Sequence, residues 1–235
     1  MWDGPSFSNG DFMWYGYEVG SDLAKIAATT CDENGECIPD GREQLHAMYQ
    51  GFILRDLSTN ITKVTHEEFD YMFRTLQRIF SSSMAATDPD LADFKNAGGK
   101  MITYHGLAST PFYIYFNLDK RYYGKQADEA ITPASTLKYY KQVMKLDNAT
   151  SDFFRYYRIP GLAHCWGGAG GQPGSMFDQL RLWVENGTAP EASPVKIQQS
   201  GNTTRDEIIC PYPKKATFEK ACTNSTSTAE CWSCE

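Results

Sequence analysis

The second half of the chain alternates between segments with the pattern of buried β-strands and segments with the pattern of amphipathic helices. Residues 100–106 and 152–160 predict strands, residues 133–146 and 175–187 predict helices, and a short last strand is expected over 195–198. Alternation of this kind packs parallel strands into one sheet that helices cover. The sequence therefore predicts the α/β fold class.

Residues at the ends of the predicted helices support this interpretation. Pro133 stands near the start of one helix, Ser175 is a candidate N-cap of the other, and Gly187 follows its end. In the first half, Thr65 and Glu68 have the spacing of a capping box, which predicts a helix from Thr65. An apolar stripe at helical spacing then indicates that this helix packs against its surroundings; it consists of Phe69, Met72, Phe73, Leu76 and Phe80.

The length and composition allow two parts. The 235 residues, 41% of them hydrophobic, suffice for one sizeable core with an appended subdomain. Residues 1–30 are rich in aromatic residues and glycine and predict irregular or short-stranded structure. The polar, glycine-ended segment 88–99 is the best candidate for a boundary, which we place between 1–90 and 91–235.

Composition also argues against several partners. A formal net charge of -7, with no concentration of Lys or Arg, makes nucleic acid a poor partner. The sequence contains no run of about 18 apolar residues, which is the length that would be needed to span a membrane. The first ten residues lack the basic and apolar regions of a signal peptide, so none is expected in this chain.

Sequons and cysteines nevertheless indicate a secreted, disulfide-bonded glycoprotein. Five Asn-x-Ser/Thr sequons occur, at Asn60, Asn148, Asn186, Asn202 and Asn224. The seven cysteines lack the paired spacing of a zinc site and favour disulfides. We expect Cys31 to pair with Cys37. Four cysteines near the C-terminus allow three pairings, of which we favour Cys210 with Cys234, and Cys165 is left over.

Two residues that follow the predicted strands are candidates for catalysis. Asp128 comes after the strand at 100–106 and a long loop, and His164 comes after the strand at 152–160. Catalytic groups collect at the carboxyl ends of parallel strands, and an acid before a histidine is the chain order of α/β-hydrolases. The histidine would take a proton from a hydroxyl nucleophile while the carboxylate orients its ring. The alternatives are an ordinary loop histidine and an ordinary acid; Asp119 is a lower-ranked candidate acid.

Several longer segments together resemble the fungal tannase and feruloyl esterase family. They are PGLAHCWGGAG and FDQLRLWVENGTAPE, WDGP near the start, DLADFKNAGGKMITYHGLA, and CPYPKKATFEK near the C-terminus, so the resemblance covers nearly the whole chain. It implies a serine carboxylic ester hydrolase acting on galloyl or feruloyl esters, either small molecules or phenolic esters of the plant cell wall. The CWGG loop favours tannase of the two.

The resemblance also implies an architecture and a role for each candidate residue. Residues 1–90 would be the second part of a lid, and 91–235 the C-terminal part of an α/β-hydrolase core. His164 would be the general base, Asp128 its acid partner, and Cys165 would form a disulfide with the cysteine beside the nucleophilic serine. No cofactor is implied, because the family's lid calcium site matches nothing in this chain.

The chain departs from the family at the nucleophile. Neither Cys-Ser-x-Gly-Gly nor G-x-S-x-G occurs in the sequence. The family's N-terminal half, with the serine, is thus expected to be missing and to be the partner of Cys165. The alternative is an inactive truncated fragment or a non-catalytic module that binds phenolics.

A second departure precedes the acid. Removing residues 108–126 restores HGLADEAITPASTLKYY, which matches the family. The hypothesis is a retained intron of 57 nucleotides, encoding these 19 residues; the alternative is a genuine loop insertion.

Among the remaining residues, we interpret His105 as a packed or turn-stabilising residue, and His46 and His66 lack partners at zinc spacing. Four aromatic residues of the first segment could stack on a phenolic ring or pack the segment's own core: Trp2, Trp14, Tyr15 and Tyr17.

Overall fold

The computed structural model describes residues 4–18, 21, 28–40, 47–107, 128–198, 203–219, 222 and 228–235. Its residues divide into two compact units. The first consists of Met1–Tyr17 with Asp22–Thr87, and the second of Glu18–Ser21 with Asp88–Glu235. The segment 108–126, Asp119 and Trp2 lie outside the described residues, so the intron hypothesis stays a prediction.

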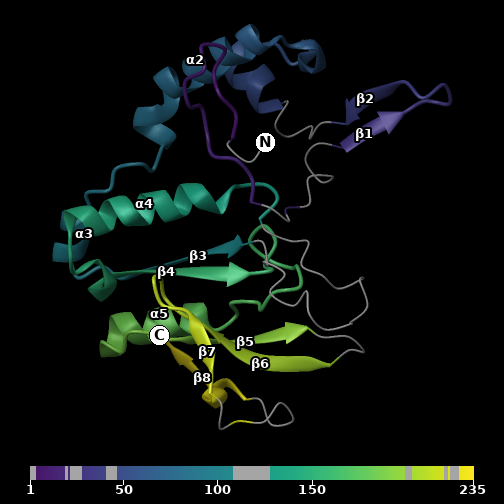
Figure 1. The fold of residues 1–235 in the computed structure, drawn as a ribbon. Helices are drawn as coiled ribbons and strands as arrows, with labels where there is room; N and C mark the ends of the chain where they lie inside the picture. Colours follow the sequence, from purple (N-terminus) through teal and green to yellow (C-terminus); the bar gives the residue numbers. More distant parts are fainter. Residues whose placement is uncertain are drawn as a thin grey trace. The chain divides into compact units, whose positions relative to one another are not determined.

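The first unit contains a hairpin and a long helix (Figure 1). Strands β1 (Ala28–Cys31) and β2 (Cys37–Asp40) pair antiparallel, and the expected Cys31–Cys37 disulfide joins their ends. A π-helical turn, η2 (Tyr49–Leu54), and a 3₁₀ turn, η3 (Ile61–Lys63), lead to α2 (His66–Met84).

The predicted capping box starts α2. The Thr65 hydroxyl accepts the backbone N–H of Glu68, and the Glu68 carboxylate accepts the backbone N–H of Thr65. The apolar stripe of the helix packs within its unit, as predicted: the rings of Phe73 and Phe7 lie 5.9 Å apart, and those of Phe80 and Phe52 lie 5.6 Å apart.

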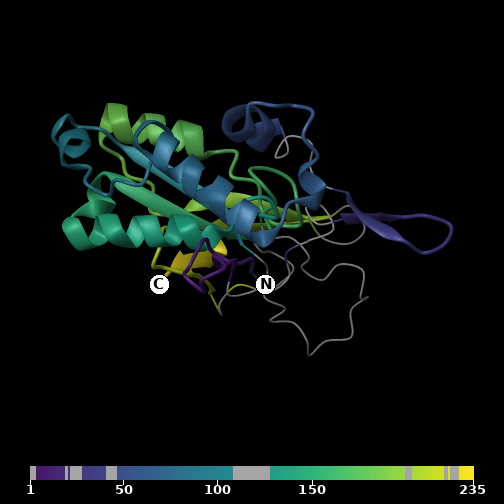
Figure 2. The same ribbon diagram turned by 90° about the horizontal axis from the view of Figure 1, so that it is seen from above.

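A parallel strand pair forms the centre of the second unit. Strands β3 (Met101–Leu107) and β4 (Phe154–Pro160) are parallel, with Met101 opposite Phe154 and Leu107 opposite Pro160. Helices α3 (Ala92–Asn96) and α4 (Pro133–Leu146) and the 3₁₀ turn η4 (Thr150–Asp152) precede these strands or connect them. Figures 1 and 2 show that α4 and α5 (Met176–Asn186) cover opposite faces of the pair.

The side chains of β4 contribute to two separate core clusters, because successive side chains of a strand point to opposite faces of the sheet. Phe154 and Tyr156 pack with Tyr140 and Val143 of α4 in one buried cluster. The other cluster consists of Tyr157, Ile159, Leu162, Met176, Val195 and Ile209. The predicted α/β class is confirmed, and parallel pairing is confirmed for β3 and β4; the strand expected at 195–198 does not join them, because it pairs antiparallel in a separate sheet.

Antiparallel strands follow α5. Strand β5 (Ser193–Gln198) pairs with β6 (Thr204–Ile209), and β7 (Ala216–Phe218) pairs with β8 (Trp232–Cys234). The prediction that the strand at 195–198 would be the last was wrong. The sequence of β6, TRDEII, carries three charged residues and so lacks the apolar run of a buried strand.

The predicted ends of two elements need correction. Ser175 makes no capping hydrogen bond; its hydroxyl lies 3.0 Å from that of Ser193 on β5. The strand expected from residue 152 begins at Phe154, because η4 includes Asp152. Gly187 ends α5 with φ of 71°, as a glycine C-cap should.

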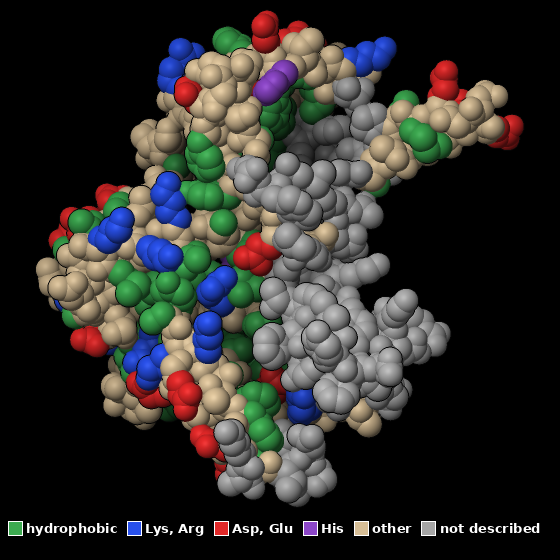
Figure 3. Space-filling view, viewed as in Figure 1, with side chains coloured by type: hydrophobic (Ala, Val, Ile, Leu, Met, Phe, Trp, Pro, Cys, Tyr) green, Lys and Arg blue, Asp and Glu red, His purple; other side chains and the backbone are tan. Residues whose placement is uncertain are grey.

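The surface charge is unevenly distributed despite the negative total. Figure 3 shows Lys and Arg side chains gathered over α4 on one face of the molecule. Lys138, Lys141 and Lys145 are exposed and recur along α4 at helical spacing. In the part of the chain that the structure describes, no helix is long and apolar enough to cross a membrane.

Candidate active site

The two candidate catalytic residues meet where β3 and β4 end. Parallel strands bring their carboxyl ends to one edge of a sheet, and here β3 ends at Leu107 opposite the end of β4 at Pro160. The backbone N–H of Asp128 approaches the carbonyl oxygen of Gly106 at 3.4 Å. The N–H of Gly161 donates to the carbonyl of Leu107 at 2.8 Å, which ties the loop of His164 to β3.

The carboxylate of Asp128 is buried and well supplied with donors. Its side chain is 5% exposed, and Oδ1 accepts the backbone N–H groups of Ala130 at 2.9 Å and Ile131 at 2.8 Å. Burial by itself would raise the pKa of this carboxyl. Hydrogen bonds from His105, His164 and these two N–H groups outweigh burial, so the pKa lies well below its usual value. Asp128 is therefore an anion at neutral pH.

The ring of His164 lies directly on this carboxylate. Its Nδ1 is 3.1 Å from Oδ1 and 3.0 Å from Oδ2 of Asp128. Because an ionised carboxylate only accepts hydrogen bonds, Nδ1 must carry a hydrogen. The neutral ring then presents a lone pair at Nε2. The His164 side chain is 41% exposed, so this nitrogen belongs to a ring that solvent and substrate can reach.

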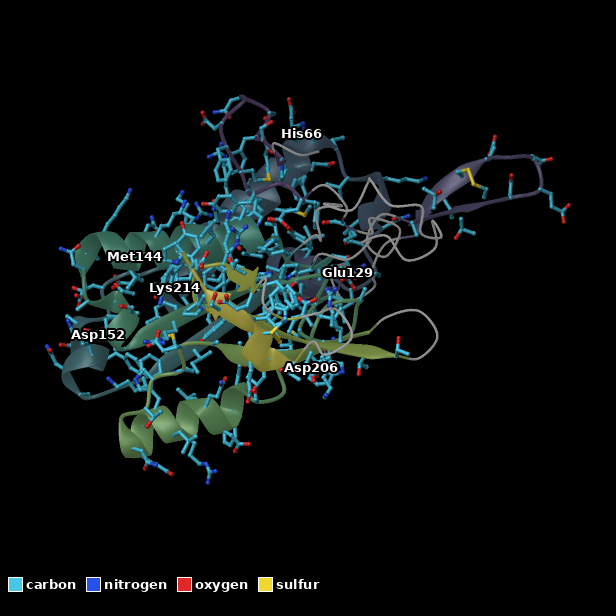
Figure 4. The ribbon with its side chains drawn as sticks, turned by 60° about the horizontal axis from the view of Figure 1, so that its bottom comes forward. His66, Glu129, Met144, Asp152, Asp206 and Lys214 are labelled. Atoms are coloured by element: carbon cyan, nitrogen blue, oxygen red, sulfur yellow. A yellow bond between two sulfur atoms is a disulfide. The ribbon has the colours of Figure 1, made fainter. Side chains whose placement is uncertain are left out.

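Two further contacts hold the backbone beside the ring. The N–H of His164 donates to Oε2 of Glu129 at 3.3 Å, and the hydroxyl of Tyr104 donates to the carbonyl of Cys165 at 3.3 Å. Glu129, labelled in Figure 4, directly follows Asp128 in the chain and is buried. Cys165 has φ of 62°, a left-handed conformation that non-glycine residues seldom adopt.

Cys165 differs from the other six cysteines. They form the disulfides Cys31–Cys37, Cys210–Cys234 and Cys222–Cys231, which confirms the favoured pairing of Cys210. Cys165 is a free, exposed thiol whose sulfur lies 3.9 Å from Nε2 of His164.

His105 is packed, as predicted, but it also contacts the candidate acid. The side chain is 9% exposed, and its Nε2 lies 3.0 Å from Oδ2 of Asp128. Sequence reasoning missed this contact and the contacts of Glu129 and Tyr104. The position of His105 near the end of β3 was the available signal, because that end lies beside the site.

The other described candidate residues belong to the first unit. His66 is an exposed residue of the first unit, 3.0 Å from the carbonyl oxygen of Ser6. Among the described residues, no group of three His, Cys, Asp or Glu side chains could hold a metal ion. Trp14 lines an apolar cavity of about 620 Å³ within the first unit, together with Phe52, Phe73 and Phe80.

Comparison with known proteins identifies relatives across the whole chain. Residues 121–234 match the family described as tannase and feruloyl esterase. A "Probable feruloyl esterase" of Arthroderma benhamiae is 26% identical over 240 residues, which cover 98% of this chain and 41% of the relative. The tannase of Aspergillus oryzae is 24% identical over 259 residues, covering 100% of this chain and 40% of the relative.

Solved structures agree on the fold. Tannin acyl hydrolase from Aspergillus niger aligns with a TM-score of 0.75 and 21% identity, covering 100% of this chain and 40% of that structure. Feruloyl esterase B from Aspergillus oryzae aligns with a TM-score of 0.69 and 20% identity, covering 100% of this chain and 44% of that structure. The chain therefore has the fold of part of these α/β-hydrolases, and it spans about two fifths of the length of these relatives.

Proposed function

Residues 121–234 belong to the tannase and feruloyl esterase family, and from this premise we propose that the chain supplies the acid and the base of a serine carboxylic ester hydrolase. The observation that carries the proposal is the contact of His164 Nδ1 with both oxygens of the buried Asp128 carboxylate, at 3.1 and 3.0 Å. A half-exposed imidazole oriented by a buried anion is the arrangement that the base of a Ser-His-Asp triad requires.

The proposed reaction uses Nε2 of His164 twice in each acyl transfer. A serine hydroxyl attacks the ester carbonyl carbon and gives its proton to Nε2. The resulting imidazolium, stabilised by Asp128, returns that proton to the leaving alcohol as the ester C–O bond breaks. Water then attacks the acyl-serine and gives a proton to Nε2, from which the serine oxygen recovers it as the acid leaves.

We propose that the serine comes from polypeptide outside the printed sequence, in which its motif does not occur. We propose that Cys165 bonds to the cysteine beside that serine. The exposed thiol, 3.9 Å from Nε2, supports this arrangement because such a bond would hold the nucleophile next to the base.

The first unit is proposed to be the second part of a lid, and the parent protein to be a secreted glycoprotein that cleaves galloyl or feruloyl esters. The sequon residues Asn60, Asn148 and Asn186 are exposed, as glycosylation requires. The CWGG loop, in which the exposed Trp166 follows Cys165, is the basis for favouring tannase.

A second candidate function is a non-catalytic module that binds phenolics. The cavity beside Trp14 supports it, because about 620 Å³ of space lined by aromatic and aliphatic side chains suits a phenolic ring. On this alternative the chain would bind gallate or ferulate esters without cleaving them.

One experiment separates the two. The 235-residue chain and the polypeptide extended upstream in the same reading frame are purified and assayed with methyl gallate and methyl ferulate. We expect the extended protein to cleave at least one ester and the shorter chain to cleave neither. His164→Ala should lower kcat of the extended protein by about six orders of magnitude, whereas the control His66→Ala should not. Hydrolysis that survives His164→Ala would exclude the proposed base.

A further inference from the structure

We propose that His105 is a positioning residue, whose buried imidazole holds the Asp128 carboxylate in the orientation that fixes the ring of His164. The inference rests on the proposed function, because it concerns the acid of the same site. Its structural part, the donation of a hydrogen bond by His105, can be measured without any ester hydrolysis.

The surroundings of His105 Nε2 determine its protonation. This nitrogen lies 2.9 Å from the carbonyl oxygen of Ile131 and 3.0 Å from Oδ2 of Asp128. Both oxygens are acceptors, and a bare nitrogen lone pair would be repelled by them. Nε2 therefore carries a hydrogen that faces both oxygens.

Thr136 completes the arrangement from the other side of the ring. Its Oγ1 lies 2.8 Å from Nδ1 of His105, within the first turn of α4. A hydroxyl can donate to a bare Nδ1, so a neutral imidazole with its hydrogen on Nε2 satisfies every neighbour. A neutral ring also avoids burying a second charge beside Asp128.

Together these donors hold the carboxylate on sides that His164 does not occupy. Oδ1 accepts two backbone N–H groups, from Ala130 and Ile131, and Oδ2 faces His105. Rotation of the carboxylate would break contacts at both oxygens. Without His105, Oδ2 would keep only the His164 ring, so the direction in which the acid holds that ring would be less well defined.

The groups around His164 make its ring a suitable reporter. Asp128 contacts Nδ1 at 3.0 and 3.1 Å, the Cys165 sulfur lies farther away, 4.0 Å from Nδ1 and 3.9 Å from Nε2, and Glu129 and Tyr104 contact the backbone next to the ring. A change at His105 should therefore reach His164 through Asp128.

The test is nuclear magnetic resonance of the ¹⁵N-labelled 235-residue chain, which has four histidines. Long-range proton–nitrogen spectra, recorded where the rings are neutral, show which nitrogen of each ring carries hydrogen. We expect Nε2–H for His105 and Nδ1–H for His164. A bare Nε2 on His105 of the unmodified folded chain would overturn the proposal without any variant.

Two variants of nearly equal size test the effect on His164. In His105→Gln the amide nitrogen reaches the place of Nε2 and can donate to Asp128. In His105→Asn it reaches only the place of Nδ1. We expect the Gln variant to keep the single Nδ1–H form of His164 and the Asn variant to show a mixture of tautomers. His66→Gln is the control for loss of a histidine.

The extended protein provides an independent readout. If it hydrolyses esters, His105→Asn should lower kcat with little change in KM, and His105→Gln should restore most of the rate. An unchanged His164 tautomer in a folded His105→Asn chain would overturn the positioning role. Absence of hydrolysis in the unmodified extended protein would instead overturn the proposed function, and the tautomer result would still stand.

Discussion

Glu129 accepts the backbone N–H of His164 at 3.3 Å, while Asp128, the preceding residue, contacts the ring of the same histidine at 3.0 Å. Two adjacent carboxylates thus hold the backbone and the side chain of one histidine. Both carboxylates belong to the short segment before α4. This segment lies beside the loop that follows β4, at the edge where β3 and β4 end.

Removing the Glu129 carboxylate should loosen the loop and leave the ring contact in place. We expect Glu129→Ala to speed hydrogen exchange of the His164 amide by about fivefold, because one hydrogen bond contributes about 1 kcal/mol. Glu129→Gln keeps an acceptor oxygen and should exchange more slowly than the Ala variant. Glu185→Ala, on the exposed face of α5, is the control. Equal exchange in all four proteins would show that this contact does not restrain the loop.

Replacing the Asp128 carboxylate should change the tautomer of His164. The amide of Asp128→Asn can donate to Nδ1, so the hydrogen of the ring should move to Nε2. Proton–nitrogen spectra of the 235-residue chain would show this directly. In an extended protein that hydrolyses esters, kcat should fall by about four orders of magnitude. A variant that keeps Nδ1–H would contradict the assignment of Asp128 as the orienting acid.

The same residue should make stability depend on pH. The pKa of Asp128 is lower in the folded chain than its ordinary value of 3.8. Its contribution to the free energy of unfolding is therefore present above about pH 4 and is lost as the pH falls through the folded value. Urea unfolding of the wild type and of Asp128→Asn should show a stability difference that shrinks between about pH 5 and pH 2. A difference that grows with acidity would contradict the lowered pKa.

Gly106 should tolerate no side chain. A Cβ at this position would collide with the carbonyl group of Leu162, because β3 and the loop after β4 approach each other closely there. We expect Gly106→Ala to lower the free energy of unfolding by about 1–3 kcal/mol, as overpacking does. Gly174→Ala is the matched control, since a Cβ there would meet no atom within 4 Å. Denaturant unfolding with equal midpoints for the two variants would refute the close approach.

The disulfides should stabilise different parts of the chain. Cys210–Cys234 spans 24 residues and joins the end of β6 to β8, whereas Cys31–Cys37 spans six residues of the hairpin in the other unit. Replacing Cys210 and Cys234 together by Ala should destabilise the second unit by about 3 kcal/mol. Hydrogen exchange of the β6 amides would measure this. The paired Cys31→Ala and Cys37→Ala change should leave those amides protected; loss of protection in both variants would contradict independent roles.

Local patterns in the sequence were sufficient for the elements whose determinants lie within a few residues of each other. The side chains of Thr65 and Glu68 each accept the backbone N–H of the other residue, and the helix that begins at Pro133 has the predicted bounds. Both could be predicted because helix ends are governed by neighbouring groups. The disulfide between Cys31 and Cys37 was predictable because the two cysteines are only six positions apart. The order of strands and helices also indicated the parallel pair, and hence that Asp128 and His164 follow strand ends at one edge.

Tertiary structure alone decided which further side chains meet at that edge. The partnership of Asp128 with His164 was predicted, but the contacts of Asp128 with His105 and of Glu129 with His164, which join residues 23 and 35 positions apart, were not. Sequence spacing does not define these distances, because they depend on the register of β3 on β4 and on the turn before α4. Ser175 shows the same limit: its hydroxyl is bound by Ser193 of β5 instead of capping its own helix. The sequence determined local backbone structure, and packing determined how polar side chains are paired, since a buried polar group takes whichever partner the fold brings within reach.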